Sequence, residues 1–229
     1  MRFDIISIFP ESFMSYFGVS MLKRAQEDGL IEIYTHNLRD FAHDKHKTVD
    51  DTPYGGGAGM VLKVEPLVEA IETVSKQQTT DNRQQTTRTI LFSAKGRVFT
   101  QADARRLAEY DRLILVCGRY EGVDERVAEH FMDEELSIGE YVLTGGEIPA
   151  MVVVDAVTRL IPGVLGNAES AATESYSEEG IVEYPQYTKP ELFRDLRVPD
   201  VLLSGHHGEI AKWRQEQSEK SSANRHSHD

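Results

Sequence analysis

Residues 112–122 read RLILVCGRYEG, an arginine and five apolar residues followed at once by a loop bounded by two glycines. The run predicts a buried strand at 112–117. On either side of it the sequence predicts a strand at 89–93 (TILFS), a helix at 100–110 and a helix at 122–131. Strands that alternate with helices in this way indicate βαβ units and a parallel sheet. We therefore predict an α/β fold.

The rest of the chain extends this pattern and then changes character. The further elements we expect are a strand at 2–8, a helix at 19–28, a strand at 30–34, a long polar loop at 37–60, a helix at 66–75, a polar insert at 76–88 and a buried helix at 147–161. Small and polar residues at 163–188 predict a linker. Short helices near 190–196 and 207–217 would then form a small C-terminal unit, which gives domains at 1–162 and 189–229.

Composition narrows the classes of protein that fit. The 229 residues carry a formal charge of −13, and the single cysteine, Cys117, excludes an intramolecular disulfide and a CxxC zinc site. The N-terminus lacks the pattern of a signal peptide, and no apolar run approaches the roughly 18 residues of a membrane span. We expect a soluble, cytoplasmic protein with no membrane partner. Acidity alone argues against nucleic acid, so an RNA site would need a local basic patch.

The usual nucleotide and metal motifs are absent from the sequence. It contains neither GxGxxG nor GxxxxGK[ST], so dehydrogenase and P-loop readings are weak. His43 and His46 lie in a polar loop, and we interpret them as solvated side chains rather than metal ligands. Cys117 has no base near it in the sequence that would form a thiolate, so we interpret it as a buried structural residue.

Glycines follow two of the predicted strands, at 118–122 and within 137–146 (SIGEYVLTGG). Ligands of open α/β folds bind at the carboxyl ends of strands, where glycine lets the backbone approach them. These loops could hold a nucleoside-like ligand, or they could be tight turns with no ligand. Asp155 and Arg159 are spaced i, i+4, which fits an ordinary surface pair or an arginine that stabilises an oxyanion.

Several long motifs in fixed order resemble one family. They are IFPESF (8–13), KHKTVDDTPYGGGAGMVLK (45–63), LVCGRYEGVDER (115–126), SIGEYVLTGGEIPAM (137–151), RLIPGVLGN (159–167), YPQYTKP (184–190) and VPDVLLSGHHGEIAKWR (198–214). Together they cover nearly the whole chain, and the chain resembles the bacterial tRNA (guanine-N1)-methyltransferases of the TrmD family, in the SPOUT superfamily.

The resemblance implies a fold, a reaction and partners. It implies a SPOUT-type parallel sheet with a deep trefoil knot, an exception to the usual unknotted topology. It implies that S-adenosylmethionine donates a methyl group to N1 of guanosine at tRNA position 37. It also implies a homodimer with active sites at the interface and a helical C-terminal domain that contacts tRNA. Magnesium has been linked to the family, but the sequence shows no conventional metal cluster and we assign no metal ligand.

The resemblance also assigns the site residues. The donor pocket is expected from Ser93, Ala94, Gly118, Tyr120, Glu121, Gly122, Ser137, Ile138, Gly139, Glu140, Tyr141, Val142, Leu143, Gly145 and Gly146. Arg159 matches the catalytic arginine. Two positions depart from the usual pattern: Ala94 replaces a common proline, and Glu174 replaces the aspartate that serves as general base.

The chemistry of guanine gives these two side chains their roles. N1 carries a proton at neutral pH, and a carboxylate within reach can remove it, which is the role we assign to Glu174. The resulting charge spreads to O6, where the guanidinium of Arg159 can stabilise it. The basic residues available for tRNA phosphates are Lys45, Lys47, Arg83, Arg88, Lys189, Arg194, Arg197, Lys212 and Arg214.

Two alternatives stay open from the sequence. The first is a related SPOUT methyltransferase that acts on another RNA base or on a ribose 2′-OH. The second is an inactive dimer that binds RNA or serves assembly.

Overall fold

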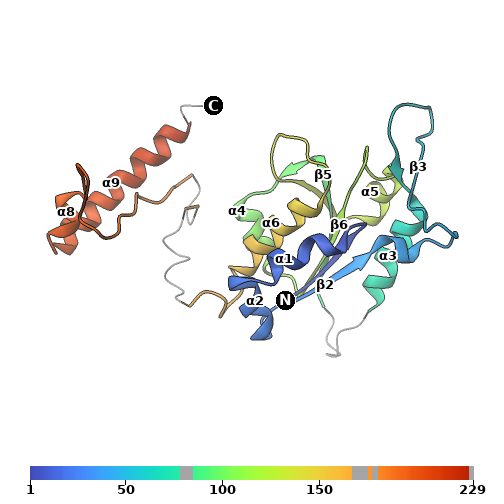
Figure 1. Ribbon diagram of the computed structural model, residues 1–229, viewed down its shortest axis with the longest axis horizontal. Coiled ribbons are helices and arrows are strands. Elements are labelled where there is room, and N and C mark those ends of the chain that lie inside the picture. Colours follow the sequence, from blue (N-terminus) through green and yellow to red (C-terminus); the bar gives the residue numbers. More distant parts are fainter. Residues whose placement is uncertain (78–84, 167–174, 177–179, 227–229) are drawn as a thin grey trace. The chain divides into compact units, whose positions relative to one another are not determined.

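In the computed structural model, residues 1–166 are built around a five-stranded parallel sheet (Figure 1). The strands are β1 (Arg2–Ser7), β2 (Glu32–Asn37), β5 (Thr87–Val98), β6 (Arg112–Cys117) and β7 (Glu134–Ser137), in the order β2-β1-β6-β5-β7. The structure describes residues 1–77, 85–166, 175–176 and 180–226. Every pairing in this sheet is parallel, and β6 has the bounds expected from its apolar run. The predicted α/β fold with a parallel sheet is confirmed.

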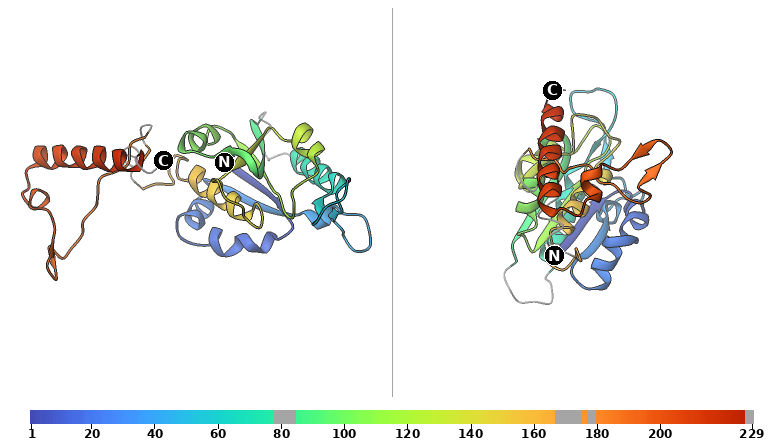
Figure 2. Two further views of the ribbon diagram at one scale, coloured as in Figure 1. Left: turned by 90° about the horizontal axis from the view of Figure 1, so that it is seen from above. Right: turned by 90° about the vertical axis from the view of Figure 1, so that its left-hand side faces the viewer.

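Helices cover both faces of the sheet. One face packs against α1 (Met14–Phe17), α2 (Ser20–Glu27), α4 (Gln101–Leu107) and α6 (Glu147–Thr158). The other packs against α3 (Val64–Lys76) and α5 (Glu125–Phe131). In Figure 1 the labelled helices α2, α4 and α6 lie to the left of β6 and α3 and α5 to its right, and Figure 2 gives a view from above.

Two separate cores result from this layering. Along β6, Leu113 and Leu115 point into the core beneath α6, whereas Ile114 and Val116 point into the core beneath α3. Successive side chains of a strand face opposite sides of its sheet, so a strand that is covered on both faces is apolar throughout. This explains why RLILVC shows no alternation of polar and apolar residues.

The long polar stretch at 37–60 contains short elements that bring it to the edge of the sheet. A 3-10 helix, η2 (Leu38–Phe41), precedes a two-stranded hairpin of β3 (Asp50–Asp51) and β4 (Val61–Leu62). The N–H of Leu62 donates to the carbonyl of Gly122, and the N–H of Glu121 donates to the carbonyl of Met60, both at 3.0 Å. The hairpin therefore holds the loop that follows β6.

Strand β5 is longer than the predicted 89–93 because it leaves the sheet and returns. Phe92 and Arg97 both pair with Leu136 of β7, so the four residues between them, 93–96, stand outside the ladder. We call residues 93–96 the β5 excursion. A pattern of buried residues predicts the strand only up to the start of such an excursion.

The chain divides into two compact units, Met1–Gly166 and Asn167–Asp229. The second contains a hairpin of β8 (Leu192–Phe193) and β9 (Leu196–Arg197), then α8 (Asp200–Leu203) and α9 (His207–His226). The helix predicted near 190–196 is therefore wrong: Arg194 has a φ of +56° in a two-residue turn, where a left-handed residue lets the strands fold back. The helix predicted at 207–217 is present and continues to His226.

The predicted domain limits at 162 and 188 stay predictions, because residues 167–174 and 177–179 lie outside the described part of the chain. Of the helices in that part, none combines the length and the apolar character that crossing a membrane requires.

Candidate active site

Three loops meet at the carboxyl ends of β5, β6 and β7 and enclose a cavity of about 460 Å³. The strands are parallel and adjacent, so their carboxyl ends lie at one edge of the sheet, the usual place for a ligand in such folds. The predicted donor-binding residues that line the cavity are Ser93, Ala94, Gly118, Tyr120, Glu121, Gly122, Ser137, Ile138, Gly139, Tyr141, Val142, Leu143, Gly145 and Gly146. Glu140, whose side chain is exposed, is not part of the lining.

The loop after β6 adopts a backbone that few residue types tolerate. Tyr120 has a φ of +61° and Gly122 a φ of +136°. Left-handed backbone at a tyrosine is costly and persists only where the surroundings impose it. The hydrogen bonds of Glu121 and Gly122 with residues 60 and 62 impose it here. The loop is thus pre-formed before any ligand arrives.

The loop after β7 packs against the loop after β6, backbone to backbone. The N–H of Gly146 donates to the carbonyl of Gly118 at 2.9 Å, and Arg119 pairs with Gly145 in an isolated bridge. A Cβ atom at Gly146 would lie 2.6 Å from the Cα of Cys117, far inside van der Waals contact. Glycine at 146 is therefore a requirement of close approach, which the sequence showed only as part of a Gly-Gly pair.

A buried carboxylate connects these loops to β1. Glu147 at the start of α6 is buried, accepts a hydrogen bond from the hydroxyl of Ser7 at 2.7 Å, and forms an ion pair with Nε of Arg119 at 3.1 Å. The guanidinium of Arg119 lies 4.7 Å from the ring centroid of Phe9, within the range of a cation–π contact. Ser7, Glu147 and Arg119 together fix the floor of the cavity to the centre of the sheet.

The β5 excursion supplies the third wall. Ser93 accepts a hydrogen bond from the N–H of Lys95 at 3.3 Å, and the ammonium of Lys95 reaches Glu125 of α5 at 2.7 Å. Both Lys95 and Glu125 line the cavity. Ala94 also lies in this excursion and lines the cavity.

Sequence reasoning missed part of the lining. The additional residues are Leu91, Phe92, Lys95, Arg119, Val123, Glu125, Leu136, Thr144 and Pro149. Most lie one or two positions from a predicted residue in the same three loops. The glycines at 118 and 122 enclose Arg119 and could have indicated it, but glycine spacing gives no signal for Lys95, because its neighbours Ser93 and Ala94 were expected only from the resemblance.

Comparison with known proteins shows the family to which this chain belongs. A family model described as tRNA (Guanine-1)-methyltransferase TrmD matches residues 1–228. The chain belongs to the TrmD family. It is 54% identical over 218 residues to a tRNA (guanine-N(1)-)-methyltransferase of Dehalococcoides mccartyi, which is 95% of this chain and 86% of that protein. Proteins of the same name from Geotalea uraniireducens and Dictyoglomus turgidum are 56% and 54% identical, over 95% and 96% of this chain and 85% and 86% of their own lengths. The resemblance inferred from the motifs is confirmed.

Of the two catalytic residues expected from the resemblance, Arg159 lies within the described residues and Glu174 does not. Arg159 is the residue that ends α6; its side chain is half-buried and is not part of the cavity lining. Its neighbour Asp155 accepts a hydrogen bond from the hydroxyl of Tyr16, which raises the pKa of that phenol. Glu174 lies outside the described residues, so its placement stays a prediction.

Cys117 and the histidines of the polar loop fit their simpler interpretations. Burial, and the nearby Glu147 carboxylate, raise the pKa of the Cys117 thiol well above its ordinary value, which keeps it protonated and unreactive. His43 is exposed and forms an ion pair with Glu69 at 2.6 Å. Within the described residues, no group of three or more histidine, cysteine, aspartate or glutamate side chains is arranged to hold a metal ion.

Proposed function

We propose that this protein transfers the methyl group of S-adenosylmethionine to N1 of guanosine at position 37 of tRNA. Membership of the TrmD family supports the reaction, tRNA guanine-N1 methylation. The observation that carries the proposal is the cavity itself, because two of its three walls, the loops after β6 and β7, are motifs that define the resemblance. Position 37 comes from the resemblance. A tRNA substrate supports a cytoplasmic location for this activity.

The cavity suits an adenosine-containing methyl donor. Its volume of about 460 Å³ lies within the range of small-molecule sites. The lining combines glycine backbone, which offers N–H and C=O groups to a base, with apolar side chains such as Leu143 and Val142 that can cover a purine face. The sulfonium of the bound donor would supply the methyl group together with its own leaving group, so no residue is needed to activate a leaving group.

We assign the proton transfer to Glu174 and the stabilisation of O6 to Arg159. A carboxylate at hydrogen-bond distance from N1 removes the proton that blocks the nitrogen lone pair. A planar guanidinium then donates to O6, where the charge gathers. Arg159 ends the helix whose first turn carries Glu147 of the cavity floor, so α6 connects the proposed stabiliser to the donor site.

An apolar surface near the cavity supports a homodimer. Helix α6 has the sequence EIPAMVVVDAVT, and its Ile148 and Val152 are exposed although its opposite side fills the core. Met14 and Tyr16 of α1 are exposed as well, and the hydrogen bond from Tyr16 to Asp155 places α1 beside α6 (Figure 1). A helix that is apolar all round is normally buried. A second copy of the chain would cover this surface, and we propose that the active sites form there.

Fewer basic residues are proposed to contact tRNA than the sequence indicated. Arg88 and Arg197 are bound to carboxylates, Arg88 to Glu134 at 3.1 Å and Arg197 to Glu191 at 2.9 Å, and Arg83 lies outside the described residues. We propose that the C-terminal unit meets the phosphates through the hairpin residue Arg194 and through Lys189, for which no competing carboxylate is described.

Methyl transfer to an unmodified tRNA transcript tests the function. The product nucleoside is mapped by mass spectrometry, with guanosine, inosine or adenosine at position 37 and with or without EDTA to reveal a need for magnesium. We expect N1-methylguanosine with the guanosine transcript and no product with adenosine. A methyl group on another base or on a ribose would refute the proposal in favour of a related SPOUT activity. Donor binding without any transfer would favour an inactive RNA-binding dimer.

Two sets of variants test the residue roles and the dimer. Glu174→Gln keeps the shape of the side chain but cannot accept a proton, so single-turnover methyl transfer should slow by roughly 10²–10⁴-fold while donor affinity is unchanged. Mixed dimers of Arg159→Ala and Glu174→Ala subunits should regain activity if the two residues serve one site from different chains. Inactive mixed dimers, or a monomer in sedimentation, would contradict the shared site.

A further inference from the structure

The β5 excursion makes one wall of the cavity, and its position depends on where β5 rejoins the sheet. Phe92 and Arg97 pair with the same residue of β7, Leu136. Between them, Ser93, Ala94 and Lys95 line the cavity but have no partner in the ladder with β7. Whatever fixes the chain at residue 97 therefore also limits the positions that this wall can take.

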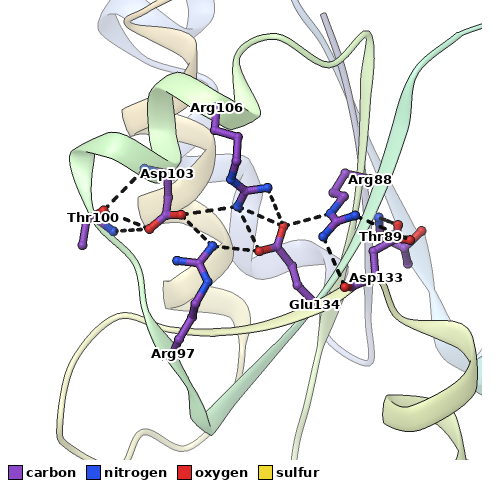
Figure 3. Close-up of polar contacts among 8 residues, drawn as sticks. All are labelled: Arg88, Thr89, Arg97, Thr100, Asp103, Arg106, Asp133 and Glu134. Carbon is purple, nitrogen blue, oxygen red and sulfur yellow. Dashed lines mark hydrogen bonds and ion pairs between the residues drawn. The ribbon is translucent and has the colours of Figure 1, made fainter.

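A group of charged side chains meets at that point (Figure 3). Nη2 of Arg97 lies 2.6 Å from Asp103 Oδ1 of α4 and 2.9 Å from Glu134 Oε2 of β7. The two carboxylates are largely buried, with side chains 9% and 11% exposed, although Arg97 itself is 49% exposed. Arg97 thus connects the end of the excursion to two different elements of the core.

Both carboxylates are held in place by other residues. Asp103 accepts hydrogen bonds from the N–H and hydroxyl of Thr100, at 3.0 and 2.9 Å, in the capping box of α4. Arg106 of α4 donates to both oxygens of Glu134, at 2.9 and 3.1 Å, and to Asp103 at 3.3 Å. Figure 3 shows that these residues form one network with Arg88 and Asp133. Within this network, Arg97 is the arginine that lies where β5 rejoins the sheet.

The other fixed points of the excursion are weaker or lie to one side. Lys95 and Glu125 form an ion pair in which both side chains are more than half exposed, and such pairs contribute little. Gly96 lies so close to β7 that a Cβ atom would be 2.7 Å from the backbone nitrogen of Leu136. That contact prevents the chain from moving towards β7 but does not hold it there. The ladder pairing of Arg97 and Val98 with β7 and the ion pairs of the Arg97 side chain supply the attraction.

We propose that Arg97 is a positioning residue for the donor cavity. By binding Glu134 and Asp103 it holds the β5 excursion in the conformation that accepts S-adenosylmethionine, without touching the ligand. Without Arg97 the excursion spends part of its time in other conformations, and the apparent affinity falls in proportion to the competent fraction. The inference rests on the proposed function, because it concerns the donor site of that reaction.

The test compares two arginines that bind the same carboxylates. Arg97→Met should weaken binding of S-adenosylmethionine about tenfold in calorimetry and raise the KM for the donor to a similar extent, with kcat at saturating donor unchanged. Arg106→Met removes the same kind of contact from Asp103 and Glu134, but on α4, and should leave donor affinity within about twofold. Thermal unfolding of both variants records their loss of stability separately.

A conservative variant and hydrogen exchange make the test independent of folding. Arg97→Lys keeps one ion pair and should recover most of the lost affinity, and Arg97→Met should speed amide exchange at 93–96 but not in β6. Equal loss of affinity in the Arg97→Met and Arg106→Met variants, or no loss in either, would overturn the inference. If Arg97→Met does not fold, wild-type affinity and exchange in Arg97→Lys would overturn it. Failure of the wild-type protein to bind the donor would instead refute the proposed function, and the inference with it.

Discussion

Replacing Asp4 with asparagine should lower stability strongly, because Asp4 is a fully buried charge that two guanidinium groups and an imidazole share. Its carboxylate accepts hydrogen bonds from Arg2 and Arg112 and lies 2.7 Å from Nε2 of His36. Burial alone would raise the pKa of Asp4, but the hydrogen bonds from His36, Arg2 and Arg112 outweigh burial and lower the pKa to about 2.

The size of the effect follows from these contacts. An Asp pKa that falls from 3.8 to about 2 on folding corresponds to about 2 kcal/mol of stability above the ordinary pKa. Asparagine keeps one acceptor oxygen but leaves Arg112, whose side chain is 3% exposed, buried without its counter-charge, at a cost of about 3 kcal/mol. For a domain of this size that is a fall in Tm of roughly 6–12 °C.

Equilibrium denaturation followed by circular dichroism measures the loss and its dependence on pH. Because the pKa of Asp4 is lower in the folded state, its contribution is complete above about pH 4 and is lost as the pH falls towards 2. The difference between wild type and Asp4→Asn should be constant from about pH 7 to 5 and shrink in acid. The matched control is Asp40→Asn, which breaks an exposed pair with Lys47 and should change little. A difference that is small at neutral pH, or that persists unchanged in acid, would refute the reasoning.

Three further outcomes are expected. Gly146→Ala should reduce donor affinity at least tenfold in calorimetry because its Cβ would overlap Cys117, whereas Gly166→Ala, in open space, should bind normally; equal affinities would contradict the close packing of the loops. Cys117 should not react with a thiol reagent at about pH 8 in the folded protein and should react in denaturant; rapid reaction of the folded protein would show that the thiol is accessible. Glu147→Gln removes the charge that holds Arg119 and should destabilise the protein by about 2 kcal/mol and weaken donor binding; unchanged denaturation and calorimetry would mean that this ion pair does not support the cavity.

The parallel sheet and the cavity loops could be predicted from sequence because both leave local patterns. The apolar run at 112–117 is as long as the strand it forms, and the glycines after it mark where the chain must turn sharply. Most residues of the cavity lining then follow from their place in the same motifs. The sequence pattern was a good guide wherever backbone geometry demanded a particular residue type.

The parts that could not be predicted depend on contacts between distant segments. The return of β5 at Arg97 is set by Leu136 and Glu134, which follow it by almost forty residues, and no periodicity records that pairing. The hairpin at 192–197 was read as a helix because its strands are only two residues long and its turn lacks glycine. The overall acidity of the chain argued against a nucleic-acid partner and was misleading for a similar reason. A net charge does not show where the charges lie or which of them form ion pairs, as Arg88 and Glu134 do.

The pairing of both Phe92 and Arg97 with Leu136 has a consequence for protein engineering. A segment whose two ends meet the same neighbour can change in length or composition without shifting the strands around it, because the register resumes where it stopped. Residues 93–95 therefore form an exchangeable cassette in one wall of the donor cavity. A library confined to these three positions would sample donor analogues with bulkier transferable groups while the two hydrophobic cores stay intact. In this wall, donor selectivity can therefore be changed by substitution without changing the stability of the fold.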